Sequence, residues 1–164
     1  MPISMHQASV PAFVQGLNAL SAILDKAAAY AEGRKIDPAA LLTARLYPDM
    51  FNFTRQVFAA TQQSVNPCAL LAGLAPPALP DAAASFADLK ARIAKAVEFM
   101  QGIAPEQIDG SEEKEIKLPF GTFKGQLFLL RLALPNFYFH CATAYDILRH
   151  NGLEIGKTDF IGRP

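Results

Sequence analysis

Charged side chains are scarce in this chain, because only 18% of its 164 residues are Asp, Glu, Lys or Arg and 51% are hydrophobic. The 15 acidic and 15 basic residues give a formal net charge of zero. Domains that bind nucleic acid carry a basic surface, so we expect no nucleic-acid partner. A surface with few charges and no net charge favours self-association.

Cysteines are few, and membrane or targeting segments are not recognisable. Cys68 and Cys141 form no C-x-x-C pair, which argues against a zinc ribbon or a thioredoxin-type site. No run of 18 apolar residues occurs, so we expect no membrane span. The opening residues MPISMHQASV lack the basic and apolar regions of a signal peptide. We therefore expect a cytoplasmic protein with free thiols.

The common catalytic signatures are also missing. The chain has no G-x-G-x-x-G, no P-loop, no G-x-S-x-G and no H-E-x-x-H. The segment GTFKGQ places two glycines near a helix start, which is only a weak signal for anion binding. Residue patterns alone therefore indicate no reaction class.

Four long amphipathic segments make up most of the chain. Their apolar residues recur every three or four positions, which predicts helices that bury one face. These segments are residues 4–32, a stretch that Pro48 starts or bends and that is renewed at Asn66-Pro67, a stretch that begins at Ser85, and residues 126–150. Gly33 is the expected stop of the first helix.

The connections predict how these helices are arranged. Residues 74–84, LAPPALPDAAA, contain three prolines and should be extended and stiff. Ten extended residues span roughly 30 Å, the length of a 20-residue helix. We therefore predict an all-α fold for the single domain 1–164, a four-helix bundle in up-down-down-up order. Its second and third helices are joined by a long crossing connection, and a small hairpin around Pro119-Phe120-Gly121 is an option before the fourth helix.

The fourth helix carries the most suggestive polar residues. Asn136 and His140 are four residues apart, so they lie on one helix face and could bind a metal together. Pro135 leaves the carbonyl of Arg131 free beside them. The alternative is a buried His140 that bonds to a backbone carbonyl or a tyrosine, and the surrounding aromatic residues favour it.

Asp49 is the second candidate, because it follows Pro48 at the expected start of the second helix. A carboxylate there caps free amides and complements the helix dipole, which is a sufficient structural role. A metal-ligand role is the alternative. His6 and His150 lie near the ends of helices, and we expect structural or surface roles for both.

Three stretches together resemble a bacterial family of unknown function, DUF1993, within the DinB/YfiT-like metalloenzyme superfamily. They are SMHQASVPAFVQGLNALSAILDKA, DPAALLTARLYPDMFNFTRQV and LPNFYFHCATAYDILRHNGLEIGKTDFIG. The resemblance covers almost the whole chain. It implies a four-helix bundle with a crossing connection, and commonly a homodimer.

The resemblance also implies a metal site, because superfamily members typically hold a divalent ion with three histidines. The corresponding positions here fall on Asn136 and His140, and near Asp49, so one histidine of three is kept. Such a set should hold a divalent metal weakly. Some relatives are thiol-dependent transferases that use the metal to activate a thiolate.

Three interpretations follow from these observations. The first is a ligand-binding or non-catalytic bundle with a degenerate metal pocket. The second is a metal-dependent enzyme, of thiol transferase or hydrolase type, that uses the pocket around His140. The third is an interaction protein without pocket chemistry.

Overall fold

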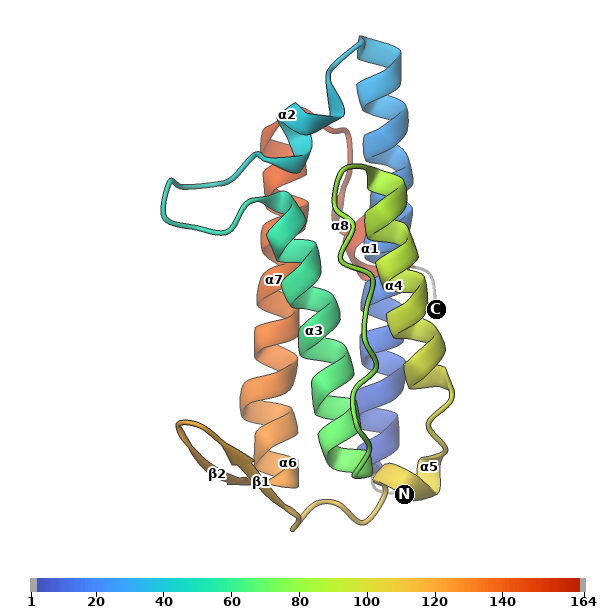
Figure 1. Cartoon of the computed structure of the whole chain (residues 1–164), viewed down its shortest axis with the longest axis vertical. Coiled ribbons are helices and arrows are strands. Elements are labelled where there is room, and N and C mark those ends of the chain that lie inside the picture. Colours follow the sequence, from blue (N-terminus) through green and yellow to red (C-terminus); the bar gives the residue numbers. More distant parts are fainter. Residues whose placement is uncertain (1–2, 163–164) are drawn as a thin grey trace.

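A computed structural model describes residues 3–162 and is mostly helical. Four long helices lie side by side (Figure 1), and they are α1 (Met5–Arg34), α3 (Phe53–Ala72), α4 (Phe86–Gln101) and α7 (Leu134–His150). The short elements are α2 (Pro38–Leu42), α5 (Pro105–Ile108), α6 (Gly125–Phe128), the π-helical turn η1 (Leu129–Ala133), α8 (Lys157–Ile161), and the strands β1 (Glu115–Leu118) and β2 (Gly121–Lys124). Within residues 3–162, no helix is both long and apolar enough to cross a bilayer.

The long helices do not alternate in direction. Figure 1 shows that α1 and α7 run one way and that α3 and α4 run the other way. The segment between α3 and α4 returns along the length of the molecule, so these two helices are parallel. The predicted hairpin is present, because β1 and β2 pair antiparallel with Glu115 opposite Lys124. The mostly helical fold with a small hairpin is thus confirmed.

Helix α1 begins where the sequence predicts and ends later than predicted. The Ser4 hydroxyl accepts a hydrogen bond from the Gln7 amide at 3.3 Å, and the Gln7 side chain accepts one from the Ser4 amide. The predicted stop at Gly33 is wrong, because the helix continues to Arg34 and Lys35 takes the left-handed conformation with φ 55°. Ile36 packs against the core just after this cap, so tertiary burial decides where the helix ends.

Helix α3 also departs from its expected boundaries. It begins at Phe53, where the Asn52 side chain caps it by accepting from the Arg55 amide at 3.0 Å. The expectation that Pro48 starts or bends this helix is therefore wrong, because Pro48 lies exposed in the loop between α2 and α3. The helix is not renewed at Pro67 either, because that residue is buried inside a continuous helix. Packing in the core offsets the hydrogen bond that the proline cannot make.

The fourth helical segment, 125–150, contains an irregular turn. It passes from α6 through the π-helical turn η1 into α7, and Pro135 lies in the first turn of α7. The Leu134 amide bonds to the carbonyl of Leu129, five residues earlier. The wider turn gives the proline ring room beside the Arg131 carbonyl, with which it would collide in an uninterrupted α-helix.

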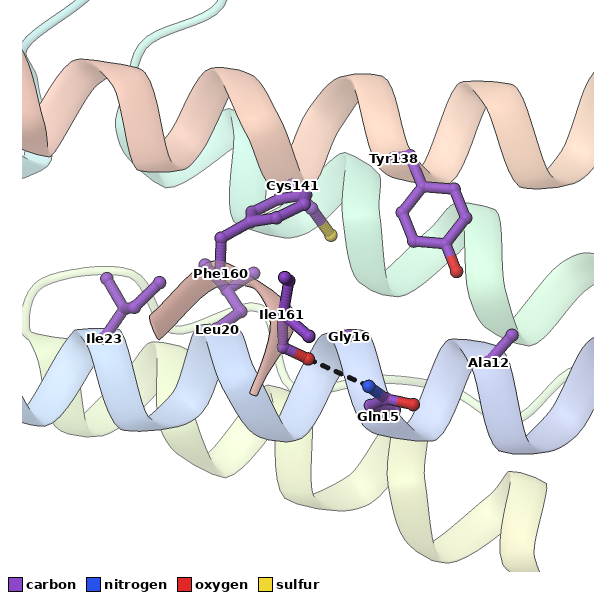
Figure 2. A pocket seen from close by; sticks show the side chains of 9 residues that line it. All are labelled: Ala12, Gln15, Gly16, Leu20, Ile23, Tyr138, Cys141, Phe160 and Ile161. Atoms are coloured by element: carbon purple, nitrogen blue, oxygen red, sulfur yellow. Dashed lines mark hydrogen bonds between the residues drawn. The ribbon is translucent and has the colours of Figure 1, made fainter. Parts of the chain in front are cut away.

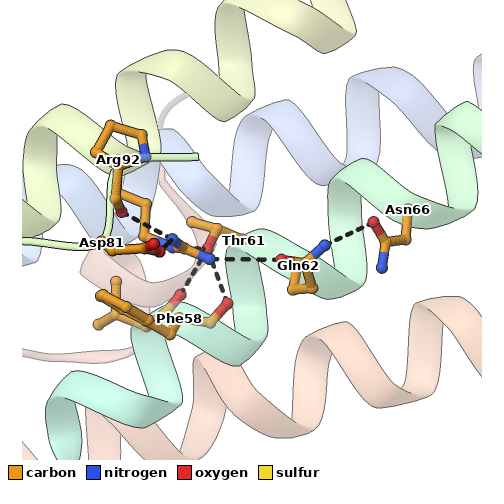
Figure 3. Close-up of polar contacts among 8 residues, drawn as sticks. Phe58, Thr61, Gln62, Asn66, Asp81 and Arg92 are labelled. Atoms are coloured by element: carbon orange, nitrogen blue, oxygen red, sulfur yellow. Dashed lines mark hydrogen bonds and ion pairs between the residues drawn. The ribbon is translucent and has the colours of Figure 1, made fainter. Parts of the chain in front are cut away.

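The crossing segment is held by one buried arginine on α4 (Figure 3). Arg92 is 4% exposed, and its guanidinium donates to the Thr61 hydroxyl and to the Pro80 carbonyl, both at 2.8 Å. The same group lies 4.0 Å from the centre of the Phe58 ring. Burial lowers the pKa of Arg92, and the nearby Asp81 carboxylate opposes this shift. Arg92 thus joins α3, α4 and the crossing segment.

Candidate functional site

His140 lies on the side of α7 that faces α3, where it meets a glutamine. Its Nδ1 atom is 2.7 Å from Oε1 of Gln56. The amide nitrogen of Gln56 donates to the Phe51 carbonyl at 3.3 Å, which turns Oε1 towards the imidazole. We therefore assign the proton of neutral His140 to Nδ1, and Nε2 keeps its lone pair.

Two aromatic rings enclose this imidazole. Phe51 stacks on His140 with an interplanar angle of 14° and a centroid distance of 6.3 Å, and Phe139 meets it edge-on at 5.3 Å. The guanidinium of Arg55 on α3 lies 4.7 Å from the centre of the Phe51 ring. Burial lowers the pKa of His140, so the neutral form is favoured.

The three residues expected to bind metal are placed very differently. Asn136 is half-buried one turn before His140 on α7. Asp49 is exposed in the loop between α2 and α3, which projects outward in Figure 1, and it does not lie in the first turn of a helix. Within the described residues, His140 has its side-chain hydrogen bond to Gln56 and none to Asp49 or Asn136.

This donor set does not fit a metal held by three histidines. Residues 3–162 contain no group of three His, Cys, Asp or Glu side chains placed to share an ion. Around His140 the polar neighbour is a carboxamide, which is a weak ligand for zinc or nickel. The set of Asp49, Asn136 and His140 therefore stays a prediction, and we derive no chemistry from a bound metal.

Gln56 is a functional candidate that was not predicted from the sequence. It is 1% exposed and lies on the inner face of α3 between Phe53 and Ala60. The sequence signal that could have identified Gln56 is its position within an apolar helical stripe, three residues after Phe53. A buried glutamine requires a partner, and such a partner would have been expected on a facing helix.

A second feature is an apolar cavity of about 210 Å³ between α1, α7 and α8 (Figure 2). None of the residues that line it is charged. They are Ala12, Gln15, Gly16, Leu20, Ile23, Tyr138, Cys141, Phe160 and Ile161. The cavity and His140 lie on different sides of α7, because His140 contacts α3 whereas Tyr138 and Cys141 face α1.

Three side chains supply the polar atoms of the cavity. The Gln15 amide nitrogen donates to the Ile161 carbonyl at 2.9 Å, which leaves its Oε1 as an acceptor. Burial raises the pKa of the Cys141 thiol to about 12. The pKa of Tyr138 is raised by burial and by the nearby Cys141. Both groups are therefore neutral at neutral pH and act as weak or moderate hydrogen-bond donors.

The comparisons with known proteins bear on the family. A family model described as a domain of unknown function (DUF1993) matches residues 5–161. The chain belongs to the DUF1993 family. This DUF1993 chain also resembles a solved crystal structure of a DinB family member protein from Shewanella denitrificans, with a TM-score of 0.92 and 36% identity. The likeness covers 97% of this chain and 92% of that chain. No curated protein is matched.

The extent of the match bears on both sites. The DUF1993 region includes His140 and Gln56, and it continues through Ile161 at the wall of the cavity. The resemblance noted in the sequence is thus confirmed at the level of the family and of the DinB-like fold. The family description itself names no ligand and no reaction.

Proposed function

We propose that this DUF1993 protein binds a small, neutral, mainly apolar molecule in the cavity between α1, α7 and α8, and that it is not a catalyst. The observation that carries the proposal is a cavity of about 210 Å³ whose lining has no charged residue. A cavity of about 150 Å³ lined by apolar side chains is large enough for benzene. A single substituted ring or a short branched chain therefore suits this one.

The polar atoms of the cavity suit a ligand with one hydroxyl or carbonyl group. The Tyr138 hydroxyl can donate to an acceptor, and Oε1 of Gln15 can accept from a donor. The Cys141 thiol has a pKa of about 12, so it supplies almost no thiolate at neutral pH. Since the thiolate is the reactive form, this cysteine is poorly suited to nucleophilic catalysis.

The experiment uses p-cresol and toluene as probes, with binding followed by protein NMR and by the thermal shift. We expect both to bind the wild type and p-cresol to bind more tightly, because only p-cresol has a hydroxyl for Gln15 or Tyr138. Ala12 points into the cavity in Figure 2, so Ala12→Leu should abolish binding. The matched control is Ala29→Leu, which adds the same side chain to an exposed position of α1.

Equal binding by the Ala12→Leu and Ala29→Leu proteins would contradict the proposal, since the probes would then occupy another place. The absence of any probe binding to the wild type would contradict it too. Perturbed NMR signals at Tyr138 and Phe160, but not at His140, are the expected footprint of a bound ring.

At His140 we propose a degenerate metal pocket, in which the imidazole makes a structural contact with Gln56 and a divalent ion binds weakly. The hydrogen bond of 2.7 Å to Gln56 and the exposed position of Asp49 support this. A metal-dependent enzyme at the same place is the competing interpretation. Metal analysis of protein purified without a histidine tag separates the two. Stoichiometric metal that is lost in His140→Ala would favour the enzyme.

We further propose that the chain is a cytoplasmic homodimer of a bundle with up-down-down-up order. Exposed large apolar side chains along α6, η1 and α7, including Leu127, Leu130 and Phe139, support an interface with a second copy. The net charge of zero adds no repulsion between copies. Light scattering should give twice the chain mass of 17.8 kDa, and Leu130→Glu should halve that value.

A further inference from the structure

The third wall of the cavity, helix α8, contributes less to the core than the other two walls. It has five residues, and none of them is buried. The wall residues of α1 and α7 belong to the core, as Leu20, Ile23 and Cys141 show. Moving α1 or α7 would therefore break the core, whereas α8 can leave its place while the core stays packed.

Among the described residues, α8 packs on α1 and α7, and Phe160 lies against the core. The Asp159 carboxylate pairs with the Lys26 ammonium at 2.6 Å, and Phe160 packs edge-on against Tyr145 with a centroid distance of 6.0 Å. The Ile161 carbonyl accepts the hydrogen bond from Gln15. Both polar contacts are exposed, so water competes for them and they hold the helix only weakly.

The chain before α8 has the form of an anchor followed by a hinge. Leu153 and Ile155 are buried, so the chain is fixed up to this point. Gly156 follows in an extended conformation, and a Cβ atom there would meet nothing within 4 Å. Glycine has few steric limits on its own φ and ψ, so Gly156 can act as the hinge of α8. Its amide donates to the Asp159 carboxylate at 2.8 Å, and rotation about Gly156 would break this hydrogen bond.

We propose that α8 is a ligand-coupled lid, which swings away about Gly156 to open the cavity and is held closed when a ligand is bound. The lid concerns the same cavity and so rests on the proposed ligand-binding function. Phe160 and Ile161 line the cavity only while α8 is docked, so a ligand gains their contacts in the closed state alone. A ligand with this preference shifts the population towards the closed state.

The first experiment cross-links the lid to α1. A Cβ atom built on Gly162 lies 3.1 Å from that of Ala19, so small shifts allow a disulfide in an Ala19→Cys/Gly162→Cys protein. The readout is the rate at which methyl methanethiosulfonate modifies Cys141, measured by peptide mass spectrometry. Gly162 has a φ of 76°, so any side chain there adds strain. Reduced thiols at positions 19 and 162 would themselves react with the reagent, so the reference is an Ala19→Ser/Gly162→Ser protein, which adds side chains of similar size and cannot cross-link.

We expect the oxidised protein to be modified at Cys141 about tenfold more slowly than the Ala19→Ser/Gly162→Ser protein, since the local opening is blocked. Cys68 is buried on α3 and is absent from the cavity lining, so its rate is the internal control and should not change. Equal rates at Cys141 in the two proteins would overturn the lid, whatever the probes do.

The second experiment measures amide hydrogen exchange of residues 157–161 in the wild type with and without saturating p-cresol. We expect exchange there to slow about tenfold on binding, while exchange in α4 is unchanged. If p-cresol perturbs Tyr138 yet leaves exchange in α8 unchanged, the lid is refuted and the binding function stands. If neither p-cresol nor toluene binds, both proposals fail together.

Discussion

Nδ1 of His140 on α7 and Oε1 of Gln56 on α3 lie 2.7 Å apart, so one hydrogen bond joins two long helices that pack directly on each other. Gln56 is buried and His140 is half-buried. Removing one partner of such a bond lowers the free energy of unfolding more than replacing both partners by apolar groups, because the remaining polar group is left unpaired.

The first prediction tests this bond by a double-mutant cycle. Gln56→Leu leaves the Nδ1 proton of His140 without its acceptor, and we expect a loss of about 1–3 kcal/mol in the free energy of unfolding. His140→Phe leaves the Gln56 oxygen unpaired and should cost a similar amount. The double variant should lose less than the sum, as measured by urea denaturation. Strictly additive losses would show that the two side chains are not coupled.

The second prediction concerns pH. Burial lowers the pKa of His140 in the folded state below its usual value of 6.5. Between the lowered pKa of the folded state and 6.5, the unfolded chain binds a proton that the folded chain does not, so the free energy of unfolding falls as the pH decreases through this range. We expect the free energy of unfolding to be constant above about pH 7 and to decline below about pH 6.5.

His140→Phe is the matching variant, because it removes the titrating group and keeps a ring at that position. The decline between about pH 6.5 and pH 5 should be smaller in this variant than in the wild type. Denaturant titrations at several pH values measure the difference. A decline of equal size in both proteins would assign the pH dependence to other groups.

The third prediction concerns Arg92 and the crossing segment. Arg92→Met removes the hydrogen bonds to Thr61 and Pro80, and we expect a loss of about 2–4 kcal/mol and faster proteolysis within residues 74–84. Arg92→Lys should recover only part of the loss, because an ammonium lacks the planar set of donors. Lys95→Met, on the exposed side of the same helix, is the control and should change stability by less than about 0.5 kcal/mol.

The fourth prediction compares two glycines. A Cβ atom on Gly125 would lie 2.0 Å from the backbone oxygen of Ser111, so Gly125→Ala should cost about 3 kcal/mol or more. Gly33 lies inside α1 with nothing within 4 Å of the same position. Gly33→Ala should therefore stabilise the protein by about 0.5–1 kcal/mol. Thermal unfolding of both variants measures the contrast, and a loss in Gly33→Ala would mean that its backbone is not helical.

Much of the fold was predictable because its signals are local. The apolar stripes predicted the long helices, and the cap at Ser4 and the stiff segment 74–84 followed from residue chemistry. The errors at Gly33 and Pro48 arose where local signals compete with packing. Ile36 and Phe53 are pulled into the core, and this burial moved both helix boundaries away from the nearest helix-breaking residue.

The sites were less predictable because each depends on residues far apart in the sequence. The sequence marked His140 but not its partner Gln56, which is 84 residues away. Nothing local indicates that Phe160 and Ile161 will close a cavity against α1, since the gap exists only after α8 has docked. The metal set of Asp49, Asn136 and His140 came from resemblance and stays a prediction.

The π-helical turn Leu129–Ala133 determines the direction in which each side chain of α7 points. Such a turn is equivalent to one inserted residue in an α-helix, and one residue corresponds to a rotation of about 100°. Without the insertion, His140 would no longer point at Gln56, and Tyr138 and Cys141 would leave the cavity wall. The one extra residue in this turn thus orients both the His140 contact with Gln56 and the α7 wall of the cavity.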